Sequence, residues 1–418
     1  MKTISTLALS IGIATTMGAG LATAAAPSVD AILDTYADIA LAGYEDALAT
    51  ARVLDAATDA LIARPSEATL NAAREAWRAS RPSYQQTEAF RFGNAIVDEW
   101  EGKVNAWPLD EGLIDYVDAS YGSESDANGL YTANVIANST ITIDGTEVDA
   151  SEITPSFLQD TLQEAGGIEA NVATGYHAIE FLLWGQDLNG TEAGAGSRPF
   201  TDYSTEANAA RRAQYLDAAT DLLVTDLEEM VANWQDDGAA RTALAGGGVA
   251  AILTGMGSLS FGELAGERMK LGLLLHDPEE EHDCFSDNTH ASHLYDGIGI
   301  RNVYLGRYVR TDGTVVEGPS IAALIASRDA ALDTEIRAQL DNSVSTLQAI
   351  ADRAEAGEAY DQQIGEGNAE GNAAVQAAID ALIAQTRSIE RAVALLELDD
   401  AVTIEQSDSL TNPDAVFE

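Results

Sequence analysis

The sequence is poor in cysteine and in lysine. Its single cysteine, Cys284, excludes any disulfide within the chain. Lysine occurs only at positions 2, 103 and 270, and 68 acidic residues against 22 Lys and Arg give a formal charge of −46. Such a charge disfavours binding to nucleic acid and to anionic membranes. After the N-terminal segment there is no uninterrupted apolar run of about 18 residues, so no membrane-spanning helix is expected.

The excess of acidic residues has two interpretations. One is a solvated acidic surface suited to a saline habitat. The other is that the negative field concentrates cations near a binding site. We expect the first.

The N-terminal residues have the layout of a secretory signal. Lys2 is followed by an apolar stretch to about Leu21 and then by the small residues "ATAAAPS". This order predicts a signal peptide over residues 1–24, cut after Ala24. Because no cysteine lies here, a lipid anchor on a processed N-terminal cysteine is excluded. The predicted location is therefore exported and periplasmic.

The remaining chain, about 390 residues, is long enough that two domains are expected. Apolar residues at helical spacing predict an all-α fold of two helical bundles, one over 25–204 and one over 205–418. Each half offers about four long helices plus one irregular insert, an arrangement that a duplication would produce. The inserts are predicted at 93–150, with a small hairpin around Asp144-Gly145, and at 276–318.

The stretch "GYHAIEFLLWGQD", residues 175–187, carries His177 and Glu180 in an otherwise apolar helix. Their spacing of three places them on one helical face, where a metal could take both as ligands. The alternative is a core histidine hydrogen-bonded to its neighbouring carboxylate. Either arrangement satisfies groups that are costly to bury unpaired.

Several stretches resemble one known family. "GYHAIE" fits the Gly-x-His-x-x-Glu motif of the imelysin-like proteins. The stretches "EAWRASRPSYQQTEAFRFG", "NAWPLDEGLIDYV" and "EEEHDCFSDNTHASHLYDGIGIRNVYLGRY" are similar to the iron-regulated protein A branch. The resemblance implies two helical bundles with a functional cleft at their interface, and it makes His177 and Glu180 the metal ligands. It also implies an exported, iron-responsive protein, although imelysin itself was described as a metallopeptidase.

Two protein ligands are too few for a tight metal site, so a third is expected. Arg81, Tyr84 and Glu88 follow one stripe of the second helix. We predict Glu88 as the facing carboxylate, with Arg81 holding it or another acid. A surface ion pair of little consequence is the alternative. Asp110 and Glu111 in "WPLDEG" are further cleft candidates.

A second group of metal-binding residue types occurs in "EHDCFSDNTHASH". We name Asp283, Asp287 and His290 as cleft candidates. The same stretch also offers Glu281, His282, Cys284 and His293. It lacks zinc-finger spacing, and its Asp and Asn residues are typical of helix caps and turns.

Two functions fit these residues. The first is an exported protein that binds a metal ion at His177, Glu180 and Glu88 for iron uptake or handling, with zinc as the other candidate metal. Its partners would be the metal or a small ligand, and an iron-uptake protein of the inner or outer membrane. The alternative is a zinc-dependent metallopeptidase of the imelysin type, for which no complete catalytic motif is present. A carboxylate-dominated cage would favour iron binding, and an open three-ligand site with a spare Glu would favour hydrolysis.

Overall fold

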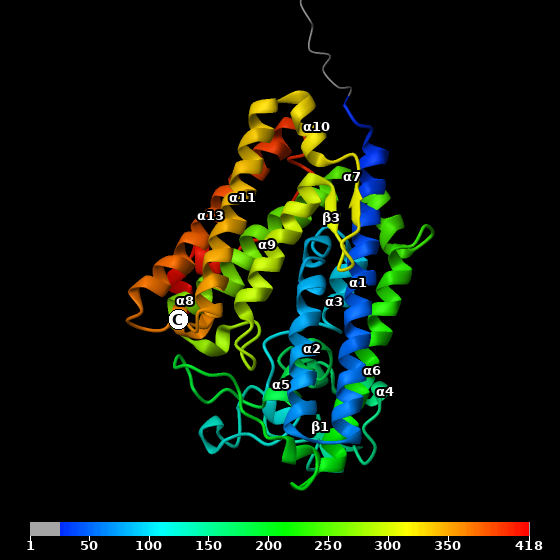
Figure 1. The fold of residues 1–418 in the computed structure, drawn as a ribbon, viewed down its shortest axis with the longest axis vertical. Coiled ribbons are helices and arrows are strands. Elements are labelled where there is room, and N and C mark those ends of the chain that lie inside the picture. The colour runs from blue at the N-terminus through cyan, green and yellow to red at the C-terminus, as the bar shows by residue number, and fades with distance from the viewer. Residues whose placement is uncertain (1–25, 418) are drawn as a thin grey trace, which may run out of the picture.

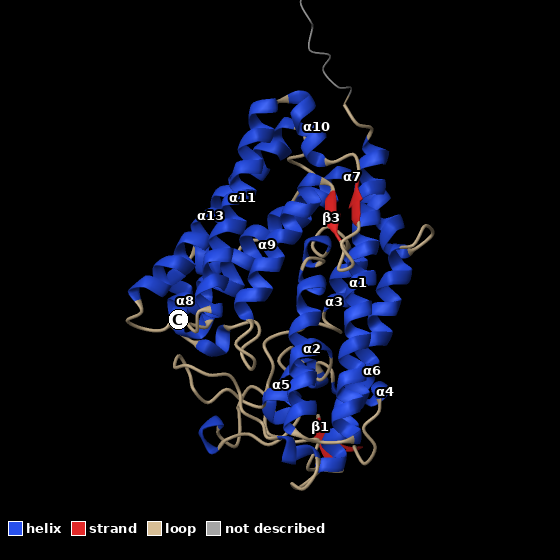
Figure 2. Ribbon diagram, viewed as in Figure 1, coloured by secondary structure: helices blue, strands red, loops and turns tan. Residues whose placement is uncertain are grey.

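The computed structural model describes residues 26–417, and the predicted signal peptide lies outside the described residues. The fold is mostly helical, as predicted, with two small hairpins as its only strands within 26–417 (Figures 1 and 2). The long helices run roughly along the length of the molecule (Figure 1).

Three helices from the first half of the chain pack together with the helix that follows residue 205: α1 (Val29–Ala63), α2 (Glu67–Gln85), α5 (Gly175–Trp184) and α6 (Ala209–Trp234). Ser28 and Ser66 cap the first two of these, because each side-chain oxygen accepts a backbone N–H of the first turn. Pro82 lies inside α2, where the sequence predicts a kink.

The segment 93–150 is largely turns, as predicted. It contains the short helix α3 (Ala95–Glu101) and the hairpin of β1 (Thr140–Ile143) and β2 (Thr146–Asp149). Asp144 and Gly145 form the tight turn, both with positive φ, which is the conformation that such a two-residue turn requires. A one-turn helix, α4 (Pro155–Phe157), follows.

The second half forms another group of packed helices. Its elements are α7 (Ala239–Ser258), a π-helical stretch (Leu259–Lys270), α8 (Leu271–Leu275), α9 (Thr289–Leu305), α10 (Ile321–Arg328), α11 (Ala330–Glu355), α12 (Tyr360–Ile364), α13 (Ala369–Leu395) and α14 (Asp408–Thr411). The first of these helices is kinked at Gly248, whose φ of 61° leaves the helical region.

The predicted irregular insert at 276–318 is wrong in its middle, where α9 forms a regular helix. Its sequence has little helical amphipathicity because the helix is buried on several sides. The hairpin of β3 (Arg307–Val309) and β4 (Val315–Glu317) completes the segment.

The two groups of helices contact each other through α7 and α9. Helix α9 packs against α2, and α7 packs against α1 and α6 (Figure 1). Helix α6 packs against α1 and α5, so the predicted boundary between residues 204 and 205 falls between helices that belong together in space. The division into two domains and its origin in a duplication stay predictions.

One helical run, Ala239–Leu275, is apolar and long enough to match a membrane span by composition. Most of its apolar window is buried within the fold. The run also carries Arg268, which forms buried ion pairs with Glu88 and Asp296. These contacts identify it as a core helix of the bundle.

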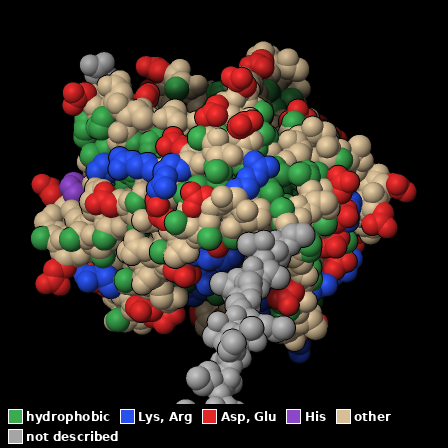
Figure 3. All heavy atoms as spheres, turned by 90° about the horizontal axis from the view of Figure 1, so that it is seen from above, with side chains coloured by type: hydrophobic (Ala, Val, Ile, Leu, Met, Phe, Trp, Pro, Cys, Tyr) green, Lys and Arg blue, Asp and Glu red, His purple; other side chains and the backbone are tan. Residues whose placement is uncertain are grey.

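Acidic side chains are spread over the face shown in Figure 3, with basic side chains lying among them. The charge is thus distributed on this face and does not form one patch. This distribution agrees with a solvated acidic surface.

Candidate metal centre

Helix α5 carries the Gly-x-His-x-x-Glu motif, and every residue of the helix is buried. Gly175 begins it with a φ of 78°, and a Cβ built there would lie 2.3 Å from the backbone oxygen of Val104. The next residue, Tyr176, donates its N–H to that same oxygen at 2.7 Å. The motif therefore needs glycine so that the helix can start directly against the loop after α3.

His177 and Glu180 contact each other directly, as in the hydrogen-bonded alternative. His177 Nδ1 lies 3.1 Å from Glu180 Oε2. The other carboxyl oxygen, Oε1, accepts the backbone N–H of Ser286 at 3.0 Å and its hydroxyl at 2.6 Å. The glutamate therefore joins α5 to the loop that precedes α9.

This loop, residues 281–288, places His282 and Asp283 beside the motif. Asp283 Oδ1 lies 3.9 Å from Nδ1 of His177 and 3.9 Å from Nδ1 of His282. Its Oδ2 accepts the amide of Asn288 at 2.9 Å and the hydroxyl of Ser292. Much of the polar sequence "DNTHAS" thus serves to orient one carboxylate.

Arg81 of α2 completes the cluster. Its Nη2 donates to Asp283 Oδ1 at 2.9 Å, and its Nη1 donates to Asn105 Oδ1 at 2.8 Å. Both side chains of the ion pair are fully buried. As predicted, Arg81 holds an acid, and that acid is Asp283.

Charge states follow from this burial. Burial and then the Arg81 charge lower the pKa of His177 to about 3, and the pKa of His282 is lowered well below its usual value, chiefly by burial. Burial would raise the pKa of Asp283, but Arg81 and its other partners bring it to about 2. Burial, followed by the Asp283 charge, raises the pKa of Glu180 well above its ordinary value. Near neutral pH the cluster thus offers two neutral imidazoles and one ionised carboxylate.

These three groups fit a metal ion. One ligand atom from each of His177, His282 and Asp283 lies within 4.8 Å of the other two. His177 Nε2 is buried and has no hydrogen-bond partner in the described part of the chain. When Glu180 is ionised, Nδ1–H of His177 donates to its Oε2 and the ring keeps a lone pair on Nε2. Two histidines and a carboxylate are a donor set used for both Fe(II) and Zn²⁺.

The second carboxylate beside the motif is Asp283, whereas the predicted Glu88 lies in another network. Glu88 Oε2 accepts Nη2 of Arg268 at 2.7 Å, and the same arginine pairs with Glu263 and Asp296. Tyr84 lies between the two networks, with its ring 4.9 Å from that of Tyr176. The side chain of Glu88 is buried, so it is not part of a surface ion pair. Its partner is Arg268 and not a metal-ligand candidate.

The remaining sequence candidates lie around the cluster. Asp110 accepts the side chain of Asn128, and Glu111 accepts Nε2 of Gln186 at 3.1 Å. His290 is half-buried on the first turn of α9 and is not part of the cluster. Asp287 belongs to a separate group of carboxylates, with Asp187 and Asp361.

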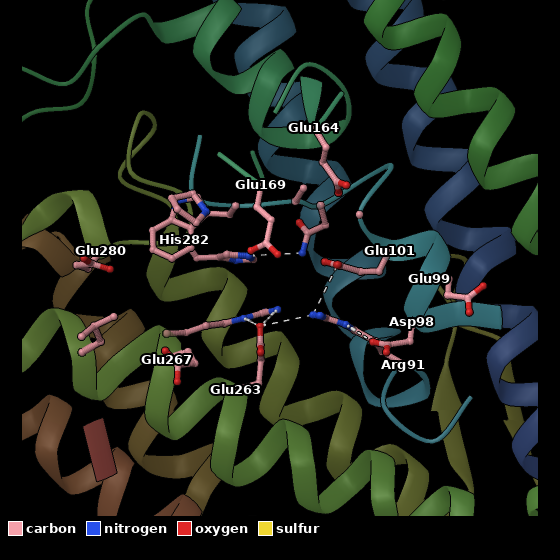
Figure 4. A pocket seen from close by; sticks show the side chains of 17 residues that line it. Arg91, Asp98, Glu99, Glu101, Glu164, Glu169, Glu263, Glu267, Glu280 and His282 are labelled. Carbon is pink, nitrogen blue, oxygen red and sulfur yellow. Dashed lines mark hydrogen bonds and ion pairs between the residues drawn. The ribbon is translucent and has the colours of Figure 1, made fainter. Parts of the chain in front are cut away.

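A cavity of about 680 Å³ adjoins the cluster at His282 and Asn105. Figure 4 shows acidic side chains directed into it from both halves of the chain, among them Glu101 and Glu263. Eight acidic residues and two arginines line it. A cation that approaches the histidines from this side would meet a strongly negative vestibule.

The site predicted from the sequence did not include His282, which was named only as a further possible ligand in the stretch 281–293. His282 lies 105 positions after His177 in the sequence, so local spacing cannot indicate that the two rings are neighbours in the fold. Asn105 and Ser286 carry no sequence signal that separates them from ordinary loop residues.

Comparisons with known proteins agree with this architecture. Residues 40–389 match the family described as imelysin, a peptidase family by name. Over 72 residues the chain is 36% identical to iron-regulated protein A of Synechococcus elongatus, an alignment that spans 17% of this chain and 20% of that relative.

Two crystal structures share the fold. One is a putative iron-regulated protein A precursor from Parabacteroides distasonis, with TM-score 0.62 and 19% identity over 89% of this chain and 97% of that one. The other is an imelysin-like protein from Psychrobacter arcticum, with TM-score 0.57 and 17% identity over the same shares. With the match over residues 40–389, the chain belongs to the imelysin family.

Proposed function

We propose that the protein binds a divalent metal, iron(II) first, at His177, His282 and Asp283, and that it serves iron uptake or handling outside the cytoplasm. The proposal rests on one observation: the neutral imidazoles of His177 and His282 and the ionised carboxylate of Asp283 each place a ligand atom within 4.8 Å of the other two. The name of the Synechococcus relative, iron-regulated protein A, supports iron as the metal.

Each surrounding residue has a distinct task. Glu180, in the ionised form that a bound cation would favour, accepts Nδ1–H of His177 and so orients the ring and fixes its tautomer. Arg81 holds Asp283 in place, and its positive charge opposes a cation. Because of this opposition we expect moderate, reversible metal affinity, which suits a protein that passes metal on.

The test is an anaerobic Fe(II) titration of the mature protein, followed calorimetrically. We expect one site in the wild type and its loss in His177→Ala and His282→Ala. Glu180→Gln should weaken affinity by about 10–100-fold, because a metal-bound histidine depends on its outer hydrogen bond. His290→Ala, another helical histidine outside the cluster, is the control and should bind normally. Wild-type affinity in both His177→Ala and His282→Ala would refute the proposal.

The alternative, a zinc peptidase, is favoured by one observation: three ligands with a spare glutamate, Glu180, beside them. Burial opposes it, because His177 is 1% exposed and both oxygens of Glu180 are already engaged. Of the three ligands, only His282 borders the large cavity. Zinc-loaded wild type should therefore leave a mixed peptide library intact, and cleavage that His177→Ala abolishes would favour the peptidase.

We also propose that residues 1–24 are removed on export and that the exported protein meets a membrane iron-uptake partner. The sequence of the N-terminal segment supports export. N-terminal sequencing of protein from the periplasm tests it, and a mature chain that still begins at Met1 would contradict it.

A further inference from the structure

A second set of potential metal ligands lies apart from the histidine cluster. One carboxylate oxygen from each of Asp187, Asp287 and Asp361 lies within 4.8 Å of the other two. They come from three separate places: the loop after α5, the loop before α9, and α12. No side chain of the described residues forms an ion pair with any of the three.

Asp361 is the unusual member. Its side chain is 2% exposed, and neither of its carboxylate oxygens accepts a hydrogen bond of good geometry within the described residues, although the backbone N–H groups of residues 361 and 362 lie near enough to lower its pKa. A buried carboxylate without donors is costly, so native structures normally pair it or place a cation beside it. The ligand atom of Asp361 lies close to those of the other two aspartates, so it points into the cluster.

A small cavity adds a second, independent sign. It measures about 10 Å³ and is lined by two of the three aspartates, Asp187 and Asp361, and by Glu281, with Asp287 outside its lining. That volume is about one water-sized sphere, enough for a single ion. Glu281 is 1% exposed, and its Oε1 also lacks a partner in the described part of the chain.

One cationic side chain, Arg78, competes with an ion for this cluster. Its charge acts on Asp287, but its Nη2 donates to the backbone oxygen of Ser286 at 2.7 Å. Burial, then the charge of Asp361, raises the pKa of Asp287 to about 7. Arg78 therefore acts on one of the three carboxylates only, and no cationic side chain acts on Asp187 or Asp361 within the described residues.

We propose that Asp187, Asp287 and Asp361 form a binding site for a hard divalent cation, Ca²⁺. The donors are all oxygens, which exclude a soft-metal preference. Ca²⁺ takes oxygen ligands at about 2.3–2.6 Å and tolerates irregular geometry, so it can bridge oxygens up to about 5 Å apart. The ion would tie the loop at 281–288 to the loop after α5 and to α12.

Thermal melts of the mature protein test the site. After chelation, 1 mM CaCl₂ should raise the melting temperature of the wild type by about 3 °C or more, relative to NaCl of equal ionic strength. Asp361→Asn should lose this rise. Because that variant removes a buried repulsive charge, it should be at least as stable as the wild type in chelator, which separates loss of the ion from failure to fold.

Asp236→Asn is the matched control, since it removes the same charge from an exposed position outside the cluster. It should keep the full Ca²⁺ response, as should His177→Ala, whose site is separate. Hydrogen exchange within 281–288 should slow with Ca²⁺ in the wild type and stay unchanged in Asp361→Asn. A Ca²⁺ response that persists in Asp361→Asn, its absence in the wild type, or an equal response to MgCl₂ would overturn the proposal.

Discussion

Arg81 and Asp283 form a fully buried ion pair, with Nη2 and Oδ1 2.9 Å apart, between α2 and the loop before α9. The pair joins residues 202 positions apart and holds the carboxylate that faces both histidines. A buried pair of this kind is costly to break, because the remaining charge stays in a dry environment.

Asp283→Asn should lower the free energy of unfolding by about 3–5 kcal/mol, because it leaves the guanidinium of Arg81 without its counter-charge. Denaturant unfolding monitored by circular dichroism measures this. Asp341→Asn is the control, since Asp341 pairs with Arg301 at the exposed surface and should cost about 0–1 kcal/mol. Equal losses in the two variants would mean that Arg81 finds another partner.

Gly175→Ala should destabilise the protein by about 2–4 kcal/mol, from positive φ and from the clash of a Cβ with Val104. Gly145→Ala has nearly the same φ, 76°, but an open surrounding, so it isolates the conformational cost of about 1–2 kcal/mol. The difference between the two melting curves reports the clash. If Gly175→Ala were no worse than Gly145→Ala, the close approach would not constrain the motif.

Stability should have an optimum at mildly acidic pH, since two sets of carboxyl groups act in opposite directions. Burial, then the Glu279 charge, raises the pKa of Glu111 to about 8. A raised folded pKa gives stability that is present below the unfolded value of about 4.3 and is lost as pH rises toward 8. Asp115 is the reverse case: burial is outweighed by Arg198 and Arg212, and its pKa is lowered.

The stability from Asp115 is therefore present above about 3.9 and is lost as pH falls further. Urea unfolding at a series of pH values from 3 to 8 measures the free energy of unfolding on both sides of the optimum, that is, on an acid limb and an upper limb. Glu111→Gln should flatten the limb between about pH 5 and 8, and Asp115→Asn should flatten the acid limb while lowering stability elsewhere. An unchanged profile in Glu111→Gln would assign the upper limb to other buried acids.

Three features could be predicted from the sequence because each depends on local spacing. They are the helical class, the hairpin at Asp144-Gly145 and the contact between His177 and Glu180. The sequence could not show which carboxylate from another part of the chain contacts His177. Glu88 and Asp283 are both buried acids beside an arginine, and only the packing of α9 on α2 decides which one faces the histidine. Helix α9 was missed for a related reason, since burial on several sides removes the amphipathic pattern.

Salt should raise the melting temperature, because the charge of −46 makes the folded chain repel itself. Screening acts within a Debye length of about 10 Å at 0.1 M and about 3 Å at 1 M, so most of the rise should occur between low and moderate salt. Buried pairs such as Arg81–Asp283 are screened little and should not oppose the trend. NaCl and KCl should act alike in chelator, whereas Ca²⁺ at equal ionic strength should exceed both only while Asp361 is present. A flat response to NaCl would mean that the surface charges are already balanced by their local partners.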